Sequence, residues 1–338
     1  MKNKTIRTLI LSDYPRSDAR EIWCFNYLKK QIKLGCLGPK QPTTGMKFIH
    51  LVISYLRKYS LVYFFSPKWD VVISNSFLEG FGLALFQLFG LRRGIKHIVI
   101  DQAALSANPL LYPIFRIVMA RVSKIICFTN LQANWWNKQL GSNKAVFIPY
   151  AILDEKNVVS TRQKNYIFSG GGSSRDYATL VRAARDLEIL FVIVSLRDPL
   201  TRKTSLEGIK LPRNVSVQSP VPHDQFLKLI RESKIMIIPL KDVLHVGGQK
   251  VLLEAFAAGK PVIVTRTAAM EDYVKDGKTG ILVKPHNPEE LKEAISSLLQ
   301  NENLRKYLGH NARKEFETTY NPREIGKKVS ELIEEVVS

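Results

Sequence analysis

The chain has 338 residues, of which 45% are hydrophobic and 24% charged, which excludes a disordered or low-complexity protein and suits two globular domains. Its net charge is +20, so an anionic lipid surface or a nucleic acid is a candidate partner. The three cysteines, Cys24, Cys36 and Cys127, form no CxxC pair; this excludes a disulfide framework or a zinc-finger spacing and favours a reducing compartment.

Short β-branched runs alternate with helix-length segments along the chain. This alternation predicts parallel sheets with helices on both faces, an α/β fold. Helices are expected at 178–187 and 289–299, and a last helix at 322–337 is expected to pack back across both halves. The expected strands are residues 8–12, 70–75, 97–100, 124–128, 145–149, 165–169, 190–195, 215–218, 234–239 and 261–265.

The positive charge is concentrated in the first half of the chain. Residues 1–150 carry 21 Lys and Arg against 6 Asp and Glu, a net charge of +15. Within this half, residues 46–66 place aromatic and aliphatic side chains at helical spacing beside lysine and arginine. This pattern is typical of a helix at a membrane surface, and a core-facing helix with a solvated basic edge is the alternative. No nucleic-acid-binding motif accompanies the charge, so an anionic membrane surface is the favoured partner over nucleic acid.

Neither a secretory signal nor a membrane-spanning helix is expected. The longest charge-free apolar run near the front, residues 80–91, is about half the ~20 residues that a bilayer requires. The expected location is cytoplasmic, with peripheral attachment to the cytoplasmic face of the membrane.

A polar stretch at 154–164 predicts a linker between domains at 1–153 and 165–321, followed by the last helix at 322–338. Two doubly wound, Rossmann-like sheets joined in this way are expected to face each other across a cleft. Ligands of such sheets bind at the carboxyl ends of the strands.

The most informative stretch is GGQKVLLEAFAAGKPVIVT, residues 247–265. Gly247 and Gly248 allow the backbone to approach a ligand closely, and the helix that follows directs unpaired N–H groups and its positive dipole end toward the same place. That arrangement suits a phosphate. Glu254 lies midway along this helix among apolar residues, where a buried carboxylate needs partners, and ribose hydroxyls would be such partners. The alternative is a structural turn, with Glu254 in an internal cap or ion pair.

These features resemble the nucleotide-binding half of GT-B glycosyltransferases, and glycosyltransferase family 4 in particular. Three stretches carry the resemblance in the family's order: 166–187, 221–240 and 247–299. The segment 121–152 is similar to the end of the family's N-terminal domain. The resemblance implies an acceptor-binding N-terminal domain and a C-terminal domain that binds a nucleoside diphosphate sugar.

The resemblance also assigns roles to single residues. Glu254 matches a glutamate that holds the donor ribose, and Gly247 matches a glycine beside the diphosphate. Gly171 and Gly172 belong to the glycine turn after the first strand of that domain. Arg175 matches a basic residue that stabilises negative charge on the departing diphosphate.

The chain departs from the family's pattern at two positions. A glutamate that touches the transferred sugar is replaced by Val246, and a second basic residue falls at Gly170. His245 or Gln249 is a candidate for the missing sugar contact. Lys250 is a candidate for the missing phosphate contact.

In the first half, Asp101 follows the expected strand 97–100, near the place of a family residue that faces the donor sugar. An ordinary strand-end carboxylate is the alternative. His97 is expected to be packed in the protein or to lie at its surface. Trp135 and Trp136 are expected in the core rather than as a sugar-stacking platform.

Other chemistries lack their motifs. There is no DxD pair, GxSxG, HExxH or GxxxxGK[ST] in the sequence, so no metal site and no cofactor are expected. The predicted function is a metal-independent, retaining hexosyltransferase of polysaccharide biosynthesis, acting on a glycan or lipid-linked acceptor. The alternatives are a non-catalytic sugar-nucleotide-binding or scaffold subunit and a sugar-nucleotide epimerase.

Overall fold

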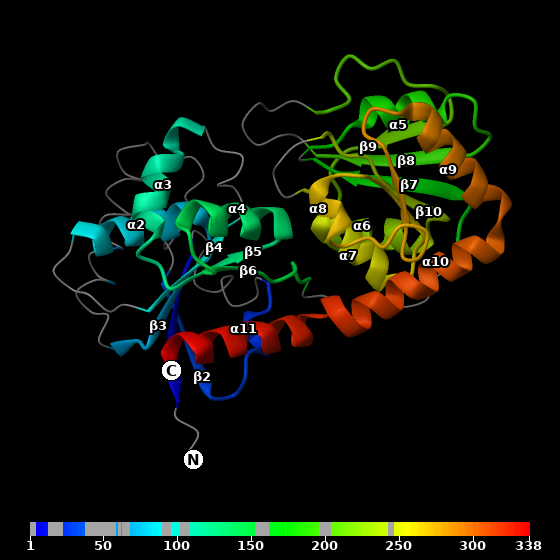
Figure 1. Cartoon of the computed structure of the whole chain (residues 1–338). Coiled ribbons are helices and arrows are strands. Elements are labelled where there is room, and N and C mark those ends of the chain that lie inside the picture. Colours follow the sequence, from blue (N-terminus) through cyan, green and yellow to red (C-terminus); the bar gives the residue numbers. More distant parts are fainter. Residues whose placement is uncertain are drawn as a thin grey trace. The chain divides into compact units, whose positions relative to one another are not determined.

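The computed structural model describes residues 5–12, 23–37, 59, 62, 68–89, 96–101, 109–152, 162–172, 174–196, 204–242 and 247–338. The chain forms two compact units. Unit 1 comprises Met1–Leu153 together with Pro322–Ser338, and unit 2 comprises Asp154–Asn321. In each unit, helices lie on both faces of a parallel sheet (Figure 1).

The sheet of unit 1 has the strand order β2-β1-β3-β4-β5-β6, and every pair is parallel. Its central strands β3 and β4 are buried along their whole length, which explains why they read as unbroken apolar runs. The strands are β1 (Ile6–Leu11), β2 (Ile32–Leu37), β3 (Val71–Ser74), β4 (His97–Asp101), β5 (Lys124–Cys127) and β6 (Ala145–Phe147).

The last helix of the chain, α11, packs on unit 1. Gly326 of α11 lies against the backbone of Tyr27, where a Cβ would stand 2.6 Å from the carbonyl oxygen. Next to it, the Lys29 N–H donates to Ser330 Oγ over 3.0 Å, and Lys29 Nζ lies 2.8 Å from Glu334 Oε2. The helices of unit 1 are η1 (Phe25–Tyr27), α2 (Phe77–Phe89), η4 (Pro109–Leu111), α3 (Tyr112–Met119), α4 (Asn130–Leu140) and α11 (Pro322–Val337).

The sheet of unit 2 has the order β12-β11-β10-β7-β8-β9 and is also parallel throughout. Reversal of the strand order between β10 and β7 creates the crevice where such sheets bind ligands, outside the carboxyl ends of the strands. The strands are β7 (Tyr166–Gly171), β8 (Leu190–Ser195), β9 (Val215–Gln218), β10 (Ile235–Ile238), β11 (Val262–Thr265) and β12 (Ile281–Val283).

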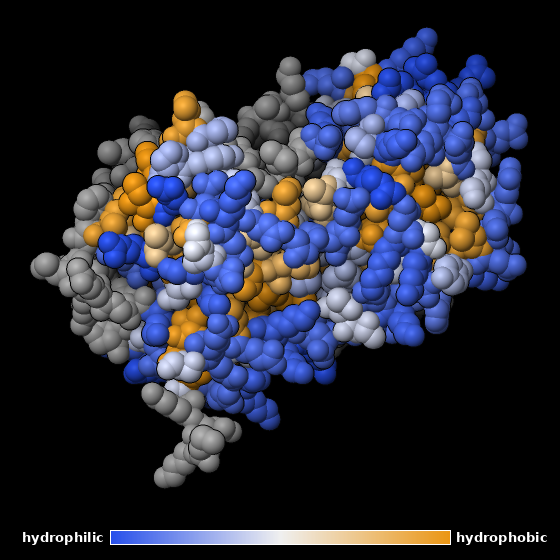
Figure 2. Space-filling model, viewed as in Figure 1, coloured by the Kyte–Doolittle hydropathy of each residue, from blue (hydrophilic) through white to orange (hydrophobic). Residues whose placement is uncertain are grey.

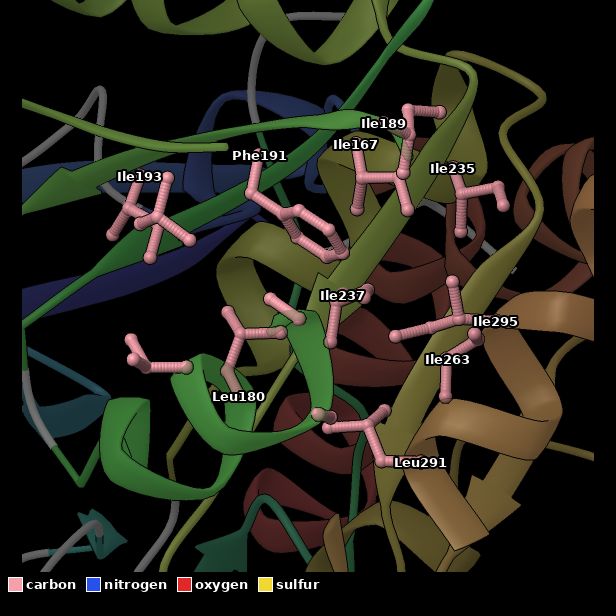
Figure 3. Packing of buried hydrophobic residues seen from close by; sticks show 14 of the residues in the cluster. Ile167, Leu180, Ile189, Phe191, Ile193, Ile235, Ile237, Ile263, Leu291 and Ile295 are labelled. Atoms are coloured by element: carbon pink, nitrogen blue, oxygen red, sulfur yellow. The ribbon is translucent and has the colours of Figure 1, made fainter. Parts of the chain in front are cut away.

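A continuous aliphatic core holds the helices of unit 2 on its sheet. In Figure 3, Ile167, Ile193 and Ile237 point from the strands toward Leu180 of α5 and Leu291 of α9, all of them buried. The helices of unit 2 are α5 (Tyr177–Ala184), α6 (His223–Glu232), α7 (Gln249–Ala257), α8 (Ala268–Glu271), α9 (Pro288–Gln300), α10 (Glu302–Glu315) and the π-helical η5 (Phe316–Tyr320).

The segment 46–66, predicted as an interfacial helix, lies outside the described residues except for Tyr59 and Val62. Both of these side chains are buried and pack with Leu9, Val72 and Leu83 in the core of unit 1. At these two positions the core-facing alternative is therefore favoured. Among the described helices of either unit, none combines the length and the apolar character that a bilayer crossing requires.

His97 is a buried neutral histidine in the sheet of unit 1. Its Nε2 lies 2.9 Å from Ser74 Oγ and its Nδ1 lies 3.0 Å from Gln87 Oε1. Because Gln87 Oε1 can only accept, Nδ1 carries the proton and Nε2 accepts from the serine hydroxyl. Burial lowers the pKa of His97 to about 3, so protonation is strongly disfavoured in the folded protein.

This burial predicts that unit 1 loses stability as the pH falls from about 6.5 to 5. The unfolded chain takes up a proton at His97 near its ordinary pKa, whereas the folded chain does not. The free energy of unfolding should therefore fall by about 1.4 kcal/mol per pH unit from this residue. Denaturant titrations of the wild type and of His97→Gln at several pH values measure the difference. Equal slopes for the two proteins would contradict the prediction.

Candidate functional site

The carboxyl edge of the unit 2 sheet presents the N-terminus of α7 without a side-chain cap. Gly248 occupies the N-cap position with φ of 92°, and within the described residues no side-chain cap is hydrogen-bonded to the first turn. A Cβ at Gly248 would lie 3.3 Å from the Ile238 side chain and 3.4 Å from that of Leu240. Positive φ and close packing both favour glycine here. The open first turn can therefore receive the oxygens of an anion.

Arg175 lies beside the turn that follows β7. Its side chain is only 3% exposed, and its Nε donates to the Gly170 carbonyl over 3.1 Å. The guanidinium crosses Gly171, where φ is +120° and a Cβ would stand 2.5 Å from Nη2. Burial lowers the pKa of Arg175, an effect that contact with Tyr177 partly opposes. A buried cation of this kind is stabilised when an anion binds next to it.

The loops that follow β7 and β10 are joined by backbone hydrogen bonds. The Asp176 N–H donates to the Pro239 carbonyl over 3.0 Å, and the Lys241 N–H donates to the Ser174 carbonyl over 2.9 Å. Arg175 forms an antiparallel bridge with Leu240, whose side chain also contacts the Cβ position of Gly248. The sequence-predicted residues Arg175 and Gly248 thus lie on either side of Leu240.

Glu254 lies in the second turn of α7 and is 6% exposed. Two nitrogen-bearing side chains, a lysine and a histidine, approach the same carboxylate oxygen, Oε1. Lys250 Nζ lies 3.9 Å away and His223 Nε2, from the first residue of α6, lies 3.6 Å away. A carboxylate at this place can accept hydrogen bonds from hydroxyl groups.

Gln249 adds a polar group to the same place. Its side chain is 3% exposed, and Nε2 has no hydrogen-bond partner among the residues that the structure describes. A buried amide nitrogen left in this state is costly, and a ligand oxygen would relieve that cost. Three predicted donor contacts remain. Gly172 packs against Leu196, where a Cβ would stand 2.8 Å from the leucine Cβ, and Gly247 is half-buried directly before the N-cap residue of α7. His245 lies outside the described residues, as does Val246.

Two contacts beside the candidate site were not predicted from the sequence. His223 stands 31 positions before Glu254 in the chain, and only the packing of α6 beside α7 brings the two side chains together. His286 Nδ1 lies 2.9 Å from Asp176 Oδ2, which joins the loop before α9 to the residue that caps α5. In both cases the sequence offers a histidine at a helix start and no signal of its partner.

The Gly170 position is filled by an aromatic ring from α6. A Cβ at Gly170 would stand 2.4 Å from Phe226 Cε2, and the Phe226 ring packs edge-on against Phe168 with 5.3 Å between centroids. The basic residue that the resemblance places here therefore has no room in this chain.

We expect Gly170→Ala to destabilise unit 2 by about 1–3 kcal/mol, the usual cost of an overpacked site. Phe226→Ala removes the ring that the new methyl group meets, so the double variant should lose less stability than the two single variants added together. Denaturant unfolding of all four proteins measures this coupling. Strict additivity would show that Phe226 does not fill the Gly170 position.

Asp101 occupies a different environment from the other predicted site residues. It is fully buried in unit 1, and its Oδ2 accepts from Trp136 Nε1 over 2.7 Å. Trp136 is itself fully buried, and Trp135 packs edge-on between Trp136 and Tyr112. This placement favours the alternative of a structural carboxylate. Trp136 lies in the core, and Trp135 is partly buried and packs against that core.

The described residues contain no cluster of three or more His, Cys, Asp or Glu side chains that could hold a metal ion. The cysteines among them are all free, and burial raises the pKa of the Cys24 and Cys127 thiols.

Comparison with known sequences agrees with the resemblance found in the sequence. Residues 154–315 match the family described as Glycosyl transferases group 1. An uncharacterized glycosyltransferase of Methanocaldococcus jannaschii is 27% identical over 227 residues, 66% of this chain and 62% of that protein. A D-inositol 3-phosphate glycosyltransferase of Corynebacterium jeikeium is 31% identical over 31% of this chain and 25% of that protein. The chain thus spans less than two thirds of these curated relatives.

Comparison with solved structures confirms the predicted GT-B fold. Sucrose-phosphate synthase from Thermosynechococcus elongatus matches with a TM-score of 0.76 at 14% identity, over 98% of this chain and 99% of that one. Anabaena HepE in complex with UDP-glucose matches with a TM-score of 0.73 at 13% identity, over 98% and 100% of the two chains.

Proposed function

We propose that the protein transfers a hexose-type sugar from a nucleoside diphosphate donor to a glycan or lipid-linked acceptor, because residues 154–315, which make up most of unit 2, match the group 1 glycosyl transferases. The new bond keeps the anomeric configuration of the donor, and the reaction needs neither a metal ion nor a cofactor. Membership of family 4 and the retaining outcome both rest on the resemblance of the sequence.

One observation carries the proposal: unit 2 brings together two complementary groups for one nucleotide. The uncapped N-terminus of α7, with Arg175 across Leu240 from Gly248, suits the diphosphate. The buried Glu254 carboxylate, one and a half turns further along α7, suits the ribose hydroxyls. The order of the two groups along one helix matches the order of phosphate and ribose in a nucleotide.

The chemistry of the step follows from these groups. As the bond between the sugar and the diphosphate breaks, negative charge grows on the leaving phosphate oxygens. Arg175 and the N–H groups at the start of α7 stabilise that charge. Lys250, whose side chain is 57% exposed, adds positive charge from the same turn, and Gln249 Nε2 donates to the sugar. His245 remains a second candidate for the sugar contact.

The first experiment identifies the donor base. It measures the shift in melting temperature with UDP, GDP, ADP and TDP and their sugar conjugates. A ligand at about 100 times its dissociation constant stabilises the fold by about 2.7 kcal/mol. Uracil is the first base to test, because HepE binds UDP-glucose in its crystal structure. One selective stabiliser, followed by acceptor-dependent release of the nucleoside diphosphate, supports the proposal. Proton NMR of the product then reads the anomeric configuration.

A non-catalytic sugar-nucleotide-binding subunit is the second candidate, favoured by the Phe226 ring that fills the Gly170 position. It predicts a selective thermal shift without turnover on any acceptor. No shift with any nucleotide would contradict both candidates.

A further inference from the structure

Helix α3 of unit 1 is apolar on two opposite faces. Its inner face packs into the core through Phe115, Val118 and Met119, which are all buried. The ring of Phe115 contacts Phe77 and Phe81 of α2, with centroid distances of 4.9 and 5.6 Å. The core is thus satisfied by one face, and the apolar side chains on the other face need a separate explanation.

The outer face leaves large aliphatic side chains in water. Leu110 is 82% exposed, Ile114 51% and Ile117 56%. Ile114 and Ile117 lie on α3, whereas Leu110 and Leu111, the latter 42% exposed, lie in the short helix η4 that leads directly into it. The spacing i, i+4 and i+7 along this continuous helical stretch puts Leu110, Ile114 and Ile117 in one stripe. Figure 2 shows hydrophobic side chains at the surface over α3, with hydrophilic ones around them.

The chain around this stripe is basic and lacks acidic residues altogether. Residues 102–153 contain no Asp or Glu and five Lys or Arg. Arg116 lies within the exposed part of α3, Arg121 is exposed just beyond its end, and Lys138 is exposed on α4. Lys144 Nζ donates to the Ala120 carbonyl over 2.7 Å, which places another cation at the C-terminal end of α3.

We propose that the outer face of η4 and α3, formed by Leu110 of η4 and by Ile114 and Ile117 of α3 and flanked by Arg116 and Arg121, docks the protein onto an anionic lipid bilayer. The aliphatic stripe enters the boundary between headgroups and acyl chains, and the arginines contact the anionic headgroups. The proposal rests on unit 1 alone and is independent of the reaction proposed for unit 2.

Charge favours a bilayer over the other possible occupants. A second copy of this chain would bring Arg116 and Arg121 against the same two arginines, which costs electrostatic energy. A nucleic acid would satisfy the cations but not the aliphatic stripe. Only an anionic lipid surface offers negative charge and an apolar layer side by side.

Co-sedimentation tests the proposal with vesicles of phosphatidylcholine alone and of phosphatidylcholine with an equal share of phosphatidylglycerol. The wild type should sediment with the anionic vesicles and much less with the neutral ones, and added salt should weaken the binding. Changing Leu110, Ile114 and Ile117 together to serine should lower the partition coefficient by about a hundredfold. Arg116→Ser with Arg121→Ser should lower it by about fivefold per residue.

The stripe is exposed to water, so the serine variants should fold as the wild type does, and circular dichroism and the melting temperature check this. A matched control changes Leu190, Leu211 and Val217 to serine; these are 44%, 40% and 40% exposed and belong to unit 2. The control should bind vesicles as tightly as the wild type.

Three results would overturn the proposal. The first is equal binding of the wild type and the α3 serine variant to anionic vesicles. The second is equal partition of the wild type between neutral and anionic vesicles. The third is a dimer, seen by analytical ultracentrifugation without lipid, that the α3 serine variant abolishes; it would assign the stripe to a second copy of the chain.

Discussion

Replacing Arg175 by methionine is expected to slow sugar transfer by about a hundredfold to a thousandfold at saturating donor. Loss of one well-placed group that stabilises developing charge has effects of this size in other enzymes. The guanidinium is held by Gly170 and crosses the bare backbone of Gly171, so it is oriented before the donor arrives. The effect should therefore appear mainly in kcat, because the charge on the leaving group is greatest in the transition state.

Arg175→Met also removes a buried contact, so a loss of folded protein must be distinguished from a loss of kcat. Steady-state kinetics measured well below the melting temperature of the variant make that separation. Arg175→Lys keeps the charge and should recover part of kcat, whereas a purely structural role would show no such recovery of rate in proteins that are equally folded. Arg185→Met, an exposed arginine at the end of α5, serves as the control. Full turnover in folded Arg175→Met would show that this side chain does not act on the leaving group.

The sheets of both units could largely be predicted from the sequence. Each of the ten strands expected from apolar β-branched runs overlaps a strand of the structure. The two that were missed, β2 and β12, are edge strands. Strand β2 reads IKLGCL, and its glycine is required because a Cβ at Gly35 would stand 2.0 Å from the Trp69 ring. Strand β12 has only three residues, too few to show a period.

In the candidate site, too, contacts between residues close in the sequence could be predicted, and contacts between separate helices could not. Gly248 and Glu254 lie on one helix and its cap, so their spacing in the sequence already fixes their spacing in space. His223 and Phe226 reach the site from α6, and such contacts depend on how two helices pack. Asp101 was predicted near the ligand because the resemblance places a residue facing the donor sugar close to this position, but Trp136, 35 residues later, supplies a buried donor for it. Sequence position alone does not reveal that partner.

Changing Glu254 to glutamine is expected to weaken donor binding by about a hundredfold. The carboxylate would accept hydrogen bonds from two ribose hydroxyls, and each bond to a charged acceptor contributes about 1.5–3 kcal/mol. Glutamine keeps the shape of the side chain but presents one carbonyl oxygen and an NH₂ group, so it cannot accept both bonds. Isothermal titration with the nucleoside diphosphate that stabilises the wild type measures the loss. Glu271→Gln, at a half-exposed position of unit 2, is the matched control.

A ligand without the hydroxyls shows whether the loss comes from the ribose. The 2′,3′-dideoxy form of the same nucleotide should bind the wild type about a hundredfold more weakly than the parent, and Glu254→Gln should weaken it little further. The Glu254→Gln and dideoxy effects would then fail to add, as two changes to one interaction do. Independent, additive losses would mean that Glu254 acts elsewhere, for example by holding His223 and Lys250 in place. In that case His223→Ala should reproduce the Glu254→Gln loss, whereas a ribose contact predicts that His223→Ala leaves the dideoxy discrimination intact.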